Sequence, residues 1–358
     1  MKNMLNHLHH QILSCLKKNG PMTAQGISEE LSVNESTISR NLRYLLECGI
    51  VFVKDHLPAK SAGGRKPRLL CLNPEWLKLL GISVEQGEIC WTISDFLGRA
   101  LFFKRLITNI DRENFEQVVS KVLFENSFDV VTIAMPGLIK SSENFIVFSE
   151  ALGIENYSLN GIYHGPFLLF NDANAAAACY LNFANNLVYL LLSIPYELSK
   201  PVGLGAGMVI NGTIYEGSNG SAGELGEGVP VIRKTPFTVE DLEKNRNLLT
   251  EHENDLEAFI KHICDKVATA VNLIDPELFV LGGDFHLLGE RVLSKVIDKI
   301  ESQVTVKRVK KINWQLDMSG SKTVALGSVL AFLERFFYDY EFAKYVFESK
   351  GCVQNGKI

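Results

Sequence analysis

Apolar side chains recur at spacings of three and four along the first fifty residues, which is the period of an α-helix. Three helices are predicted from this pattern. Their inward positions are Leu5, Leu8, Ile12 and Leu16, then Ala24, Ile27 and Leu31, then Ile38, Leu42, Leu45 and Leu46. Gly20 and Pro21 end the first helix, Thr23 starts the second, and the third lies between an Asn34 N-cap and Gly49. The short turn before the third helix predicts a helix-turn-helix.

The outer face of the third predicted helix carries side chains that suit DNA. The candidate contacts on this helix are Ser36, Thr37, Ser39, Arg40 and Arg43. Short hydroxyl side chains at the N-terminal end allow close approach to base edges and phosphates, and arginines reach guanine or phosphate. A solvated helix face is the alternative for any one of these residues.

A β-hairpin is predicted after the third helix, from Ile50–Lys54 and Leu69–Leu72. Its loop is basic and contains glycine, with Lys60, Ser61, Gly63, Gly64, Arg65, Lys66 and Arg68. A hairpin of this kind behind a helix-turn-helix indicates the wing of a winged helix, and Gly64, Arg65 and Lys66 are its candidate DNA contacts. A plain surface loop is the alternative.

The charge of the chain is unevenly distributed. The 358 residues carry a formal charge of −5, but residues 1–75 hold ten basic and six acidic residues, a net of +4. The remainder holds 26 basic and 35 acidic residues, a net of −9. We therefore expect a basic DNA-binding domain over residues 1–75, ending near Asn73-Pro74, attached to an acidic body.

Beyond Pro74, short apolar strands alternate with helical segments in two successive halves. The predicted elements are Leu79–Val84, Ile89–Ile93, Ala100–Phe103, a helix at Phe115–Phe124, Val130–Ala134, Phe167–Phe170, an alanine-rich helix from Asn171, Leu187–Ile194, Met208–Ile210, Thr213–Tyr215, Phe279–Leu281 and a helix at Val324–Tyr338. Asn211-Gly212 predicts a type I′ hairpin turn. We expect a duplicated α/β fold with a ligand cleft at the carboxyl ends of strands. The first lobe would cover 76–185 plus a C-terminal helix at about 323–345, and the second 186–322.

A series of short motifs in the body resembles the ROK family (repressors, open reading frames and sugar kinases). The matching stretches are Ala134–Gly137, Asn171–Ala177, Gly203–Gly207 with the Asn211-Gly212 hairpin, Gly217–Gly226, Leu281–Gly283 and Ala325–Ser328. The wing Gly63–Pro67 is similar to that of ROK repressors. The resemblance implies an α/β fold with an N-terminal winged helix-turn-helix and a two-lobed actin/hexokinase-like (ribonuclease H-like) body.

Sugar kinases of this family need a catalytic aspartate and two phosphate-holding loops. Asp172 matches the aspartate; capping of the alanine-rich helix is the alternative. Ser83 replaces an acid of the first loop, and Glu85 and Glu88 place negative charge where phosphates would lie. In the second loop, Pro201-Val202 replaces residues that supply a backbone donor and a hydroxyl. We therefore predict that the protein is not an enzyme and that Asp172 is a vestigial base.

The resemblance also implies a sugar site. Its candidate residues are Asn171, Asp172, Glu224, Glu227 and Glu243. The match of Glu243 is loose, and a solvated helix face is its alternative. Glu227 stands where the family has a histidine that binds both sugar and a structural zinc, and the clustered cysteines of that zinc site are missing. No metal and no cofactor are predicted.

The chain is expected to be a cytoplasmic, sugar-responsive repressor that binds operator DNA as a homodimer or higher homo-oligomer. Its seven scattered cysteines indicate reduced thiols, and its longest apolar run, Leu187–Pro195, is too short to cross a membrane. Two alternatives stay open. The first is an active ATP-dependent sugar kinase with a DNA-binding arm, and the second is a sensor whose body binds no sugar and holds a dimer together.

Overall fold

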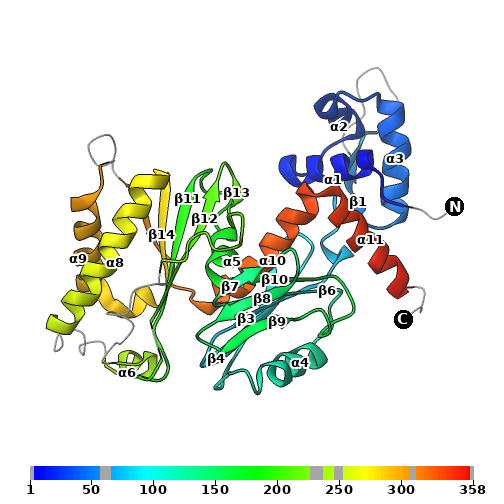
Figure 1. The fold of residues 1–358 in the computed structure, drawn as a ribbon. Helices are drawn as coiled ribbons and strands as arrows, with labels where there is room; N and C mark the ends of the chain where they lie inside the picture. Colours follow the sequence, from blue (N-terminus) through cyan, green and yellow to red (C-terminus); the bar gives the residue numbers. More distant parts are fainter. Residues whose placement is uncertain are drawn as a thin grey trace.

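The N-terminal part of the chain is a winged helix-turn-helix (Figure 1). The computed structural model describes residues 4–56, 66–200, 202–225, 237–245, 253–305 and 312–354. The first elements are α1 (His7–Asn19), α2 (Ala24–Leu31), α3 (Glu35–Glu47), β1 (Val51–His56) and β2 (Arg68–Leu72). Thr23 and Asn34 cap α2 and α3 through side-chain oxygens, and Gly49 follows α3 with φ +72°. The predicted helices and their caps are confirmed, but four of the predicted inward positions are half-buried instead of fully inside: Leu8, Ala24, Leu31 and Leu46.

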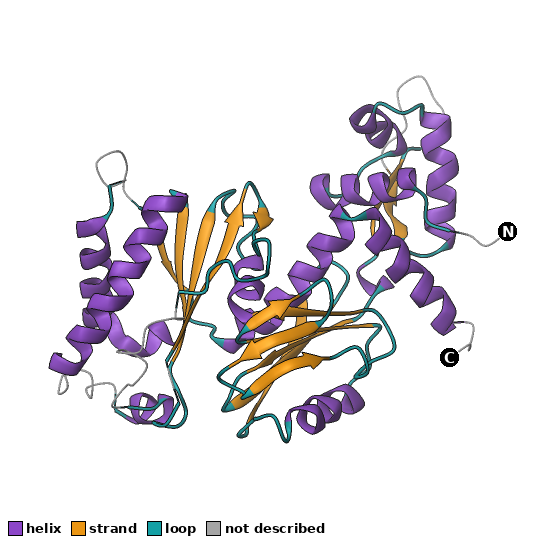
Figure 2. Cartoon of the chain, in the orientation of Figure 1, coloured by secondary structure: helices purple, strands orange, loops and turns teal. Residues whose placement is uncertain are grey.

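Two five-stranded sheets of the same topology form the body (Figure 2). The first contains β3 (Leu79–Val84), β4 (Glu88–Ser94), β5 (Ala100–Ile107), β6 (Val130–Met135) and β10 (Phe167–Asn171). The second contains β11 (Leu187–Ser193), β12 (Gly203–Ile210), β13 (Thr213–Ile214), β14 (Leu278–Gly283) and β15 (Trp314–Leu316). In each, the first strand has an antiparallel meander on one side and two parallel strands on the other. The predicted duplication is confirmed.

Helices cover both sheets and also fill the space between them. The covering helices are α4 (Phe115–Glu125) on the first sheet and α8 (Glu253–Ile274) and α9 (Gly289–Gln303) on the second. Between the sheets lie α5 (Asp172–Ala178), against the second sheet, and α10 (Ser321–Tyr338), against the first. A side chain at Gly207 would collide with the α5 backbone, and one at Gly327 likewise, so glycine and alanine let these layers approach closely.

Several elements were not predicted from the sequence. A three-stranded sheet of β7 (Leu138–Lys140), β8 (Phe145–Ser149) and β9 (Ile154–Ser158) follows β6, and α6 (Val239–Lys244) precedes α8. Two 3₁₀ helices, η1 (Pro74–Trp76) and η2 (Asp284–Leu288), start after Asn73 and β14. The C-terminal segment forms two helices, because the chain leaves the helical conformation at Asp339 before α11 (Tyr340–Gln354).

The two C-terminal helices join the body to the winged helix. Of the aromatic side chains near the end of α10, Phe332, Phe336 and Phe337 are buried in the core, whereas Tyr338 is 81% exposed. Within the described segments, no helix is both long and apolar enough to cross a bilayer.

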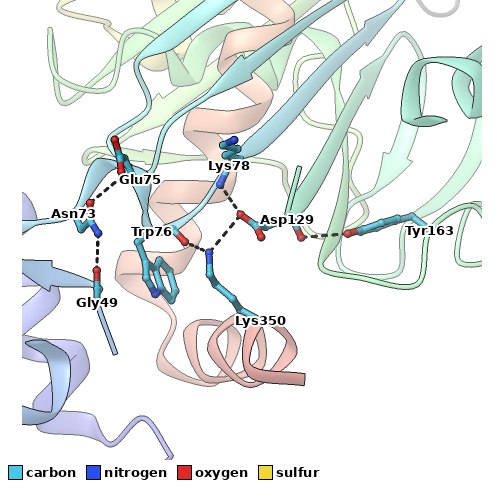
Figure 3. A network of polar contacts seen from close by, with 8 residues as sticks. All are labelled: Gly49, Asn73, Glu75, Trp76, Lys78, Asp129, Tyr163 and Lys350. Carbon is cyan, nitrogen blue, oxygen red and sulfur yellow. Dashed lines mark hydrogen bonds and ion pairs between the residues drawn. The ribbon is translucent and has the colours of Figure 1, made fainter. Parts of the chain in front are cut away.

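A polar network fixes the linker between the winged helix and the first sheet (Figure 3). Asn73 Nδ2 donates to the Gly49 carbonyl at 2.8 Å, which ties the linker to the end of α3. The Lys350 ammonium of α11 donates to the Trp76 carbonyl and lies 3.4 Å from the Asp129 carboxylate. The Lys78 amide donates to the same carboxylate at 2.8 Å. The DNA-binding domain is therefore held to the body by more than its covalent linker.

Candidate functional site

The outer face of α3 presents the residues expected to contact DNA. Ser36, Ser39, Arg40 and Arg43 are exposed, and Thr37 is half-buried. Ser36 also donates its hydroxyl to Asn34 Oδ1 at 2.8 Å, so it is part of the N-cap. The two arginines lie three residues apart and therefore share a helix face. In the wing, Lys66 is exposed, while Gly64 and Arg65 lie outside the described residues.

A cleft between the two sheets has a volume of about 650 Å³. Its walls come from the carboxyl ends of the central parallel strands: β3 and β6 of the first sheet, β11 and β14 of the second, and β10 at its Asn171 end. Ligands bind at such strand ends in open α/β sheets, because side chains and loops from both halves converge there. The cleft is therefore the position at which this fold presents a small-molecule site.

Four of the five residues predicted for the sugar site line this one cleft. They are Asn171, Asp172, Glu224 and Glu243, and they come from β10, α5, the segment after β13 and α6. Glu243 is exposed on its helix and faces the cleft from the edge. Glu227 lies outside the described residues.

The structure decides which residue caps the alanine-rich helix. Asn171 is the N-cap of α5, because its Oδ1 accepts from the Asn174 amide at 3.1 Å while its Nδ2 donates to the Gly137 carbonyl. The alternative that Asp172 is the cap is therefore wrong. Asp172 is 6% exposed, and its Oδ1 accepts from the Ala173 amide at 2.7 Å. Burial raises the pKa of Asp172 to about 6, which the amide contacts partly oppose.

Two further carboxyl groups of the cleft have raised pKa values. Burial raises the pKa of Glu85 well above its usual range, and the nearby charges of Asp172, Glu88 and Asp284 add to this shift. Burial also raises the pKa of Asp284 to about 7, against the opposing effect of the Ile194 amide that donates to Asp284 Oδ2 at 2.7 Å. Three carboxyl groups that hold protons more tightly than usual therefore line the same cleft.

The Glu88 side chain is held by three neighbouring side chains. It is 4% exposed, and its carboxylate accepts from the Arg105 guanidinium, from the Tyr196 hydroxyl at 3.0 Å and from the Ser321 hydroxyl. Its negative charge is therefore neutralised by Arg105 inside the cleft. Both glutamates that the sequence placed against phosphates, Glu85 and Glu88, line the cleft.

Sequence reasoning missed some of the residues that shape the cleft. Asp284 directly follows β14, as Asp172 directly follows β10, so its position at a strand end was a usable signal. Arg105 and Tyr196 carried no such signal, because they reach Glu88 from the edge strand β5 and from the loop after β11.

The metal-binding potential of the described part of the chain is low. No group of three or more His, Cys, Asp and Glu residues there is arranged to hold an ion. The six cysteines with described side chains are free thiols, at Cys15, Cys48, Cys71, Cys90, Cys179 and Cys264.

A winged helix-turn-helix joined to a two-lobed α/β body with a polar cleft is the architecture of a ligand-responsive DNA-binding regulator. Comparison of the sequence with known families agrees with this class. Residues 113–240 match the ROK family, and residues 10–52 match the bacterial regulatory protein, arsR family. The chain therefore carries a ROK family domain behind a helix-turn-helix of the arsR family type.

Curated proteins similar to this chain include xylose repressors. The chain is 22% identical to a xylose repressor of Caldicellulosiruptor bescii over 381 residues, which cover 89% of this chain and 93% of that protein. It is 26% identical to a xylose repressor of Bacillus subtilis over 239 residues, which cover 60% of this chain and 58% of that protein.

Solved structures support the fold. A ROK family transcriptional regulator, described as a homologue of the E. coli MLC protein, superimposes with a TM-score of 0.73 at 16% identity, covering 95% of this chain and 98% of that one. A ROK hexokinase from Thermus thermophilus superimposes with a TM-score of 0.56 at 18% identity, covering 72% of this chain and 99% of that chain. The hexokinase therefore shares the fold of a smaller part of this chain than the regulator does.

Proposed function

We propose that the protein is a sugar-responsive DNA-binding repressor whose cleft takes a neutral sugar effector. The observation that carries the proposal is that Asn171, Asp172, Glu224 and Glu243 meet in one cleft of a chain that also presents Arg40 and Arg43 on an exposed recognition helix. The xylose repressor relatives make D-xylose the first effector to test.

The cleft residues suit a sugar because carboxylates accept hydrogen bonds from hydroxyl groups in fixed directions. Asp172 is nearly buried, and its Oδ1 is already engaged with the Ala173 amide, so Oδ2 is the atom that receives a ligand hydroxyl. Asn171 orients this end of the cleft through its two hydrogen bonds to Asn174 and Gly137.

We infer that the protein does not phosphorylate its ligand. Glu85 and Glu88 line the cleft, and Arg105 is paired with Glu88 and so is not available to a phosphate. Ser83 stands where the family's kinases have an acid. It is 1% exposed on β3, and its hydroxyl has no hydrogen-bond partner among the described residues.

We further propose that the protein acts as a homodimer. Two winged helices related by a two-fold axis bind half-sites one or more helical turns apart, so a change in their separation changes operator affinity. A sugar would alter that affinity through its preference for one arrangement of the two lobes.

The test is a measurement of DNA binding with and without D-xylose. Genomic fragments retained by the wild-type protein supply the operator, and fluorescence anisotropy gives its dissociation constant. Arg40→Ala should weaken operator binding about tenfold or more, because a bidentate arginine contact contributes about 1–3 kcal/mol. Arg112→Ala serves as the control. Unchanged affinity in Arg40→Ala would refute the recognition-helix assignment.

The kinase alternative has a separate test. The protein is incubated with ATP, Mg²⁺ and a panel of pentoses and hexoses, and ADP is measured. Sugar-dependent ADP production that disappears in Asp172→Asn would overturn the proposal of a non-catalytic body. Thermal-shift measurements with the same sugars test the second alternative, because a sugar bound to the native state raises the melting temperature.

A further inference from the structure

Glu88 is the point at which three separate parts of the body meet. Arg105 reaches it from β5 of the first sheet, Tyr196 from the loop after β11 of the second sheet, and Ser321 from the first position of α10. The Arg105 guanidinium also donates to the Tyr196 hydroxyl at 3.3 Å. The contact is therefore a closed polar junction between the two sheets and the start of a helix.

The polar junction around Glu88 is tightly packed where Tyr196 of the second sheet enters it. The Tyr196 ring lies against Gly87, where any side chain would collide with it, and it also packs against the core of the second sheet. A movement of that sheet relative to the first must therefore shift Tyr196 away from Gly87 and Glu88. Because Glu88 also lines the cleft, a ligand that moves the lobes changes this contact.

The negative charge of Glu88 stabilises the start of α10 in particular. Gly320 precedes this helix and supplies no side-chain cap, so the first-turn amides of Lys322 and Thr323 donate only to the backbone carbonyls of Ser319 and Gly320, at 3.3 and 2.9 Å. A carboxylate beside a helix N-terminus interacts favourably with the helix dipole. The Ser321 hydroxyl fixes Glu88 at this end.

The other end of α10 is bound to the DNA-binding domain. The 18 residues of α10 span about 27 Å and run from the cleft to α1 (Figure 1). There, His10 Nε2 lies 2.9 Å from the Phe336 carbonyl, and the Ser14 hydroxyl donates to the Phe337 carbonyl at 2.7 Å. The aromatic side chains of Phe336 and Phe337 are inside the core that continues into α1 and α3.

We propose that Glu88 is the positioning residue through which the state of the cleft reaches α10 and thereby the DNA-binding helices. The proposal rests on the function proposed above, since it assigns the route by which the effector acts. Glu88 binds neither sugar nor DNA in this scheme. Without the Glu88 carboxylate, the sugar and the DNA should each still bind, but sugar binding should no longer change the affinity for DNA.

The first test needs no ligand. Hydrogen exchange is measured on the full chain for the wild type, Glu88→Gln and Tyr196→Phe, with Glu155→Gln and Tyr215→Phe as exposed controls. Amides in the first turn of α10 should exchange at least tenfold faster in Glu88→Gln, with a smaller increase in Tyr196→Phe. Wild-type exchange in both variants would overturn the proposal. If Glu88→Gln does not fold, Tyr196→Phe decides, because it removes a single hydroxyl.

The second test measures coupling. D-Xylose affinity is obtained by calorimetry, and affinity for the retained genomic fragment is measured with and without D-xylose. Glu88→Gln should bind D-xylose and DNA within about threefold of the wild type, while the effect of D-xylose on DNA affinity falls at least tenfold. A wild-type response in this variant would refute the proposal. If the wild type itself binds no sugar or no DNA, the proposed function fails, and hydrogen exchange alone decides the role of Glu88.

Discussion

The two ends of α10 are built from different chemistry. At the cleft end, Ser321 contacts an ion pair of Glu88 and Arg105, whose guanidinium side chain is 43% exposed. At the opposite end, Phe336 is fully buried, with its ring 5.9 Å from that of Trp76 and 5.4 Å from that of Phe96. A junction made of a few directional polar contacts has to exchange these contacts when the two sheets move, whereas a close-packed aromatic core moves as one body. We infer that the Phe336 end of α10 moves rigidly with the DNA-binding domain, whereas the contacts of its Ser321 end change when the cleft changes.

The largest loss of stability is expected at the aromatic end of α10, where Phe336 packs against Trp76 and Phe96. Phe336→Ala removes a fully buried ring and should lower the free energy of unfolding by about 3–5 kcal/mol, since the surrounding rings cannot close the cavity completely. Urea denaturation followed by circular dichroism measures the change. Phe183→Ala is the control, because Phe183 is 66% exposed. A loss below about 1 kcal/mol would contradict the assignment of this end as the rigid one.

The pH dependence of the free energy of unfolding should have opposite signs for a buried group at the cleft and one in the DNA-binding domain. At the cleft, the pKa of Asp284 is raised to about 7, so the native state holds a proton that the unfolded chain has already released. Stability from this group is therefore present at low pH and is lost as pH rises from about 4 to 7. In α1, burial lowers the pKa of His9 to about 4, so the native state resists protonation and this contribution is lost as pH falls below about 6.5.

Two variants isolate these contributions. Relative to the wild type, Asp284→Asn should gain roughly 1–2 kcal/mol of unfolding free energy between pH 5 and pH 8. His9→Gln should gain stability relative to the wild type as pH falls from 6.5 to 5, and glutamine keeps the capping contact with the Asn6 amide. Urea denaturation at each pH measures both. The same sign of pH dependence in the two variants would refute the comparison.

The sequence predicted most of the elements that α10 contacts, because these rest on local patterns. The period of Ile38, Leu42 and Leu45 identified α3, and Asn211-Gly212 identified the hairpin. The missed elements are β7 to β9, β15, α6, α8, α9 and α11. The short strands gave little signal because packing against distant segments stabilises them. The helices α8 and α9, 22 and 15 residues long, carry apolar positions at helical spacing, a usable signal that was missed.

The candidate site was predicted to a similar extent. Asn171 and Asp172 were found because the stretch Asn171–Ala177 resembles a family motif, and their place between a buried strand and a helix is a local feature that agrees with it. The contacts of Glu88 with Tyr196 and Ser321 join residues 108 and 233 positions apart. Such pairs follow from the relative placement of the two sheets, which no periodicity within one segment encodes.

A smaller loss of stability is expected where Lys350 of α11 contacts the linker beside the aromatic end of α10. The Lys350 ammonium contacts the Trp76 carbonyl and the Asp129 carboxylate and lies 5.3 Å from the centre of the Trp76 ring (Figure 3). Lys350→Ala should reduce the free energy of unfolding by about 1–2 kcal/mol, because the pair is only partly screened by solvent. Denaturation of Lys121→Ala, an exposed lysine on α4, gives the reference. Equal stability of the two variants would show that α11 does not support this end.

The smallest effect should come from the polar contacts at the aromatic end. The Ser14 hydroxyl donates to the Phe337 carbonyl on α10 and, at 3.0 Å, to the His10 carbonyl of its own helix. Ser14→Ala should cost about 0.5–1 kcal/mol of unfolding free energy, because one net hydrogen bond is lost while the aromatic packing remains. Ser349→Ala is the matched control, since the Ser349 hydroxyl donates to the Tyr345 carbonyl within α11. If Ser14→Ala instead destabilised the protein as strongly as Phe336→Ala, hydrogen bonding and not aromatic packing would hold α10 to the DNA-binding domain, and both ends of the helix would then be polar junctions.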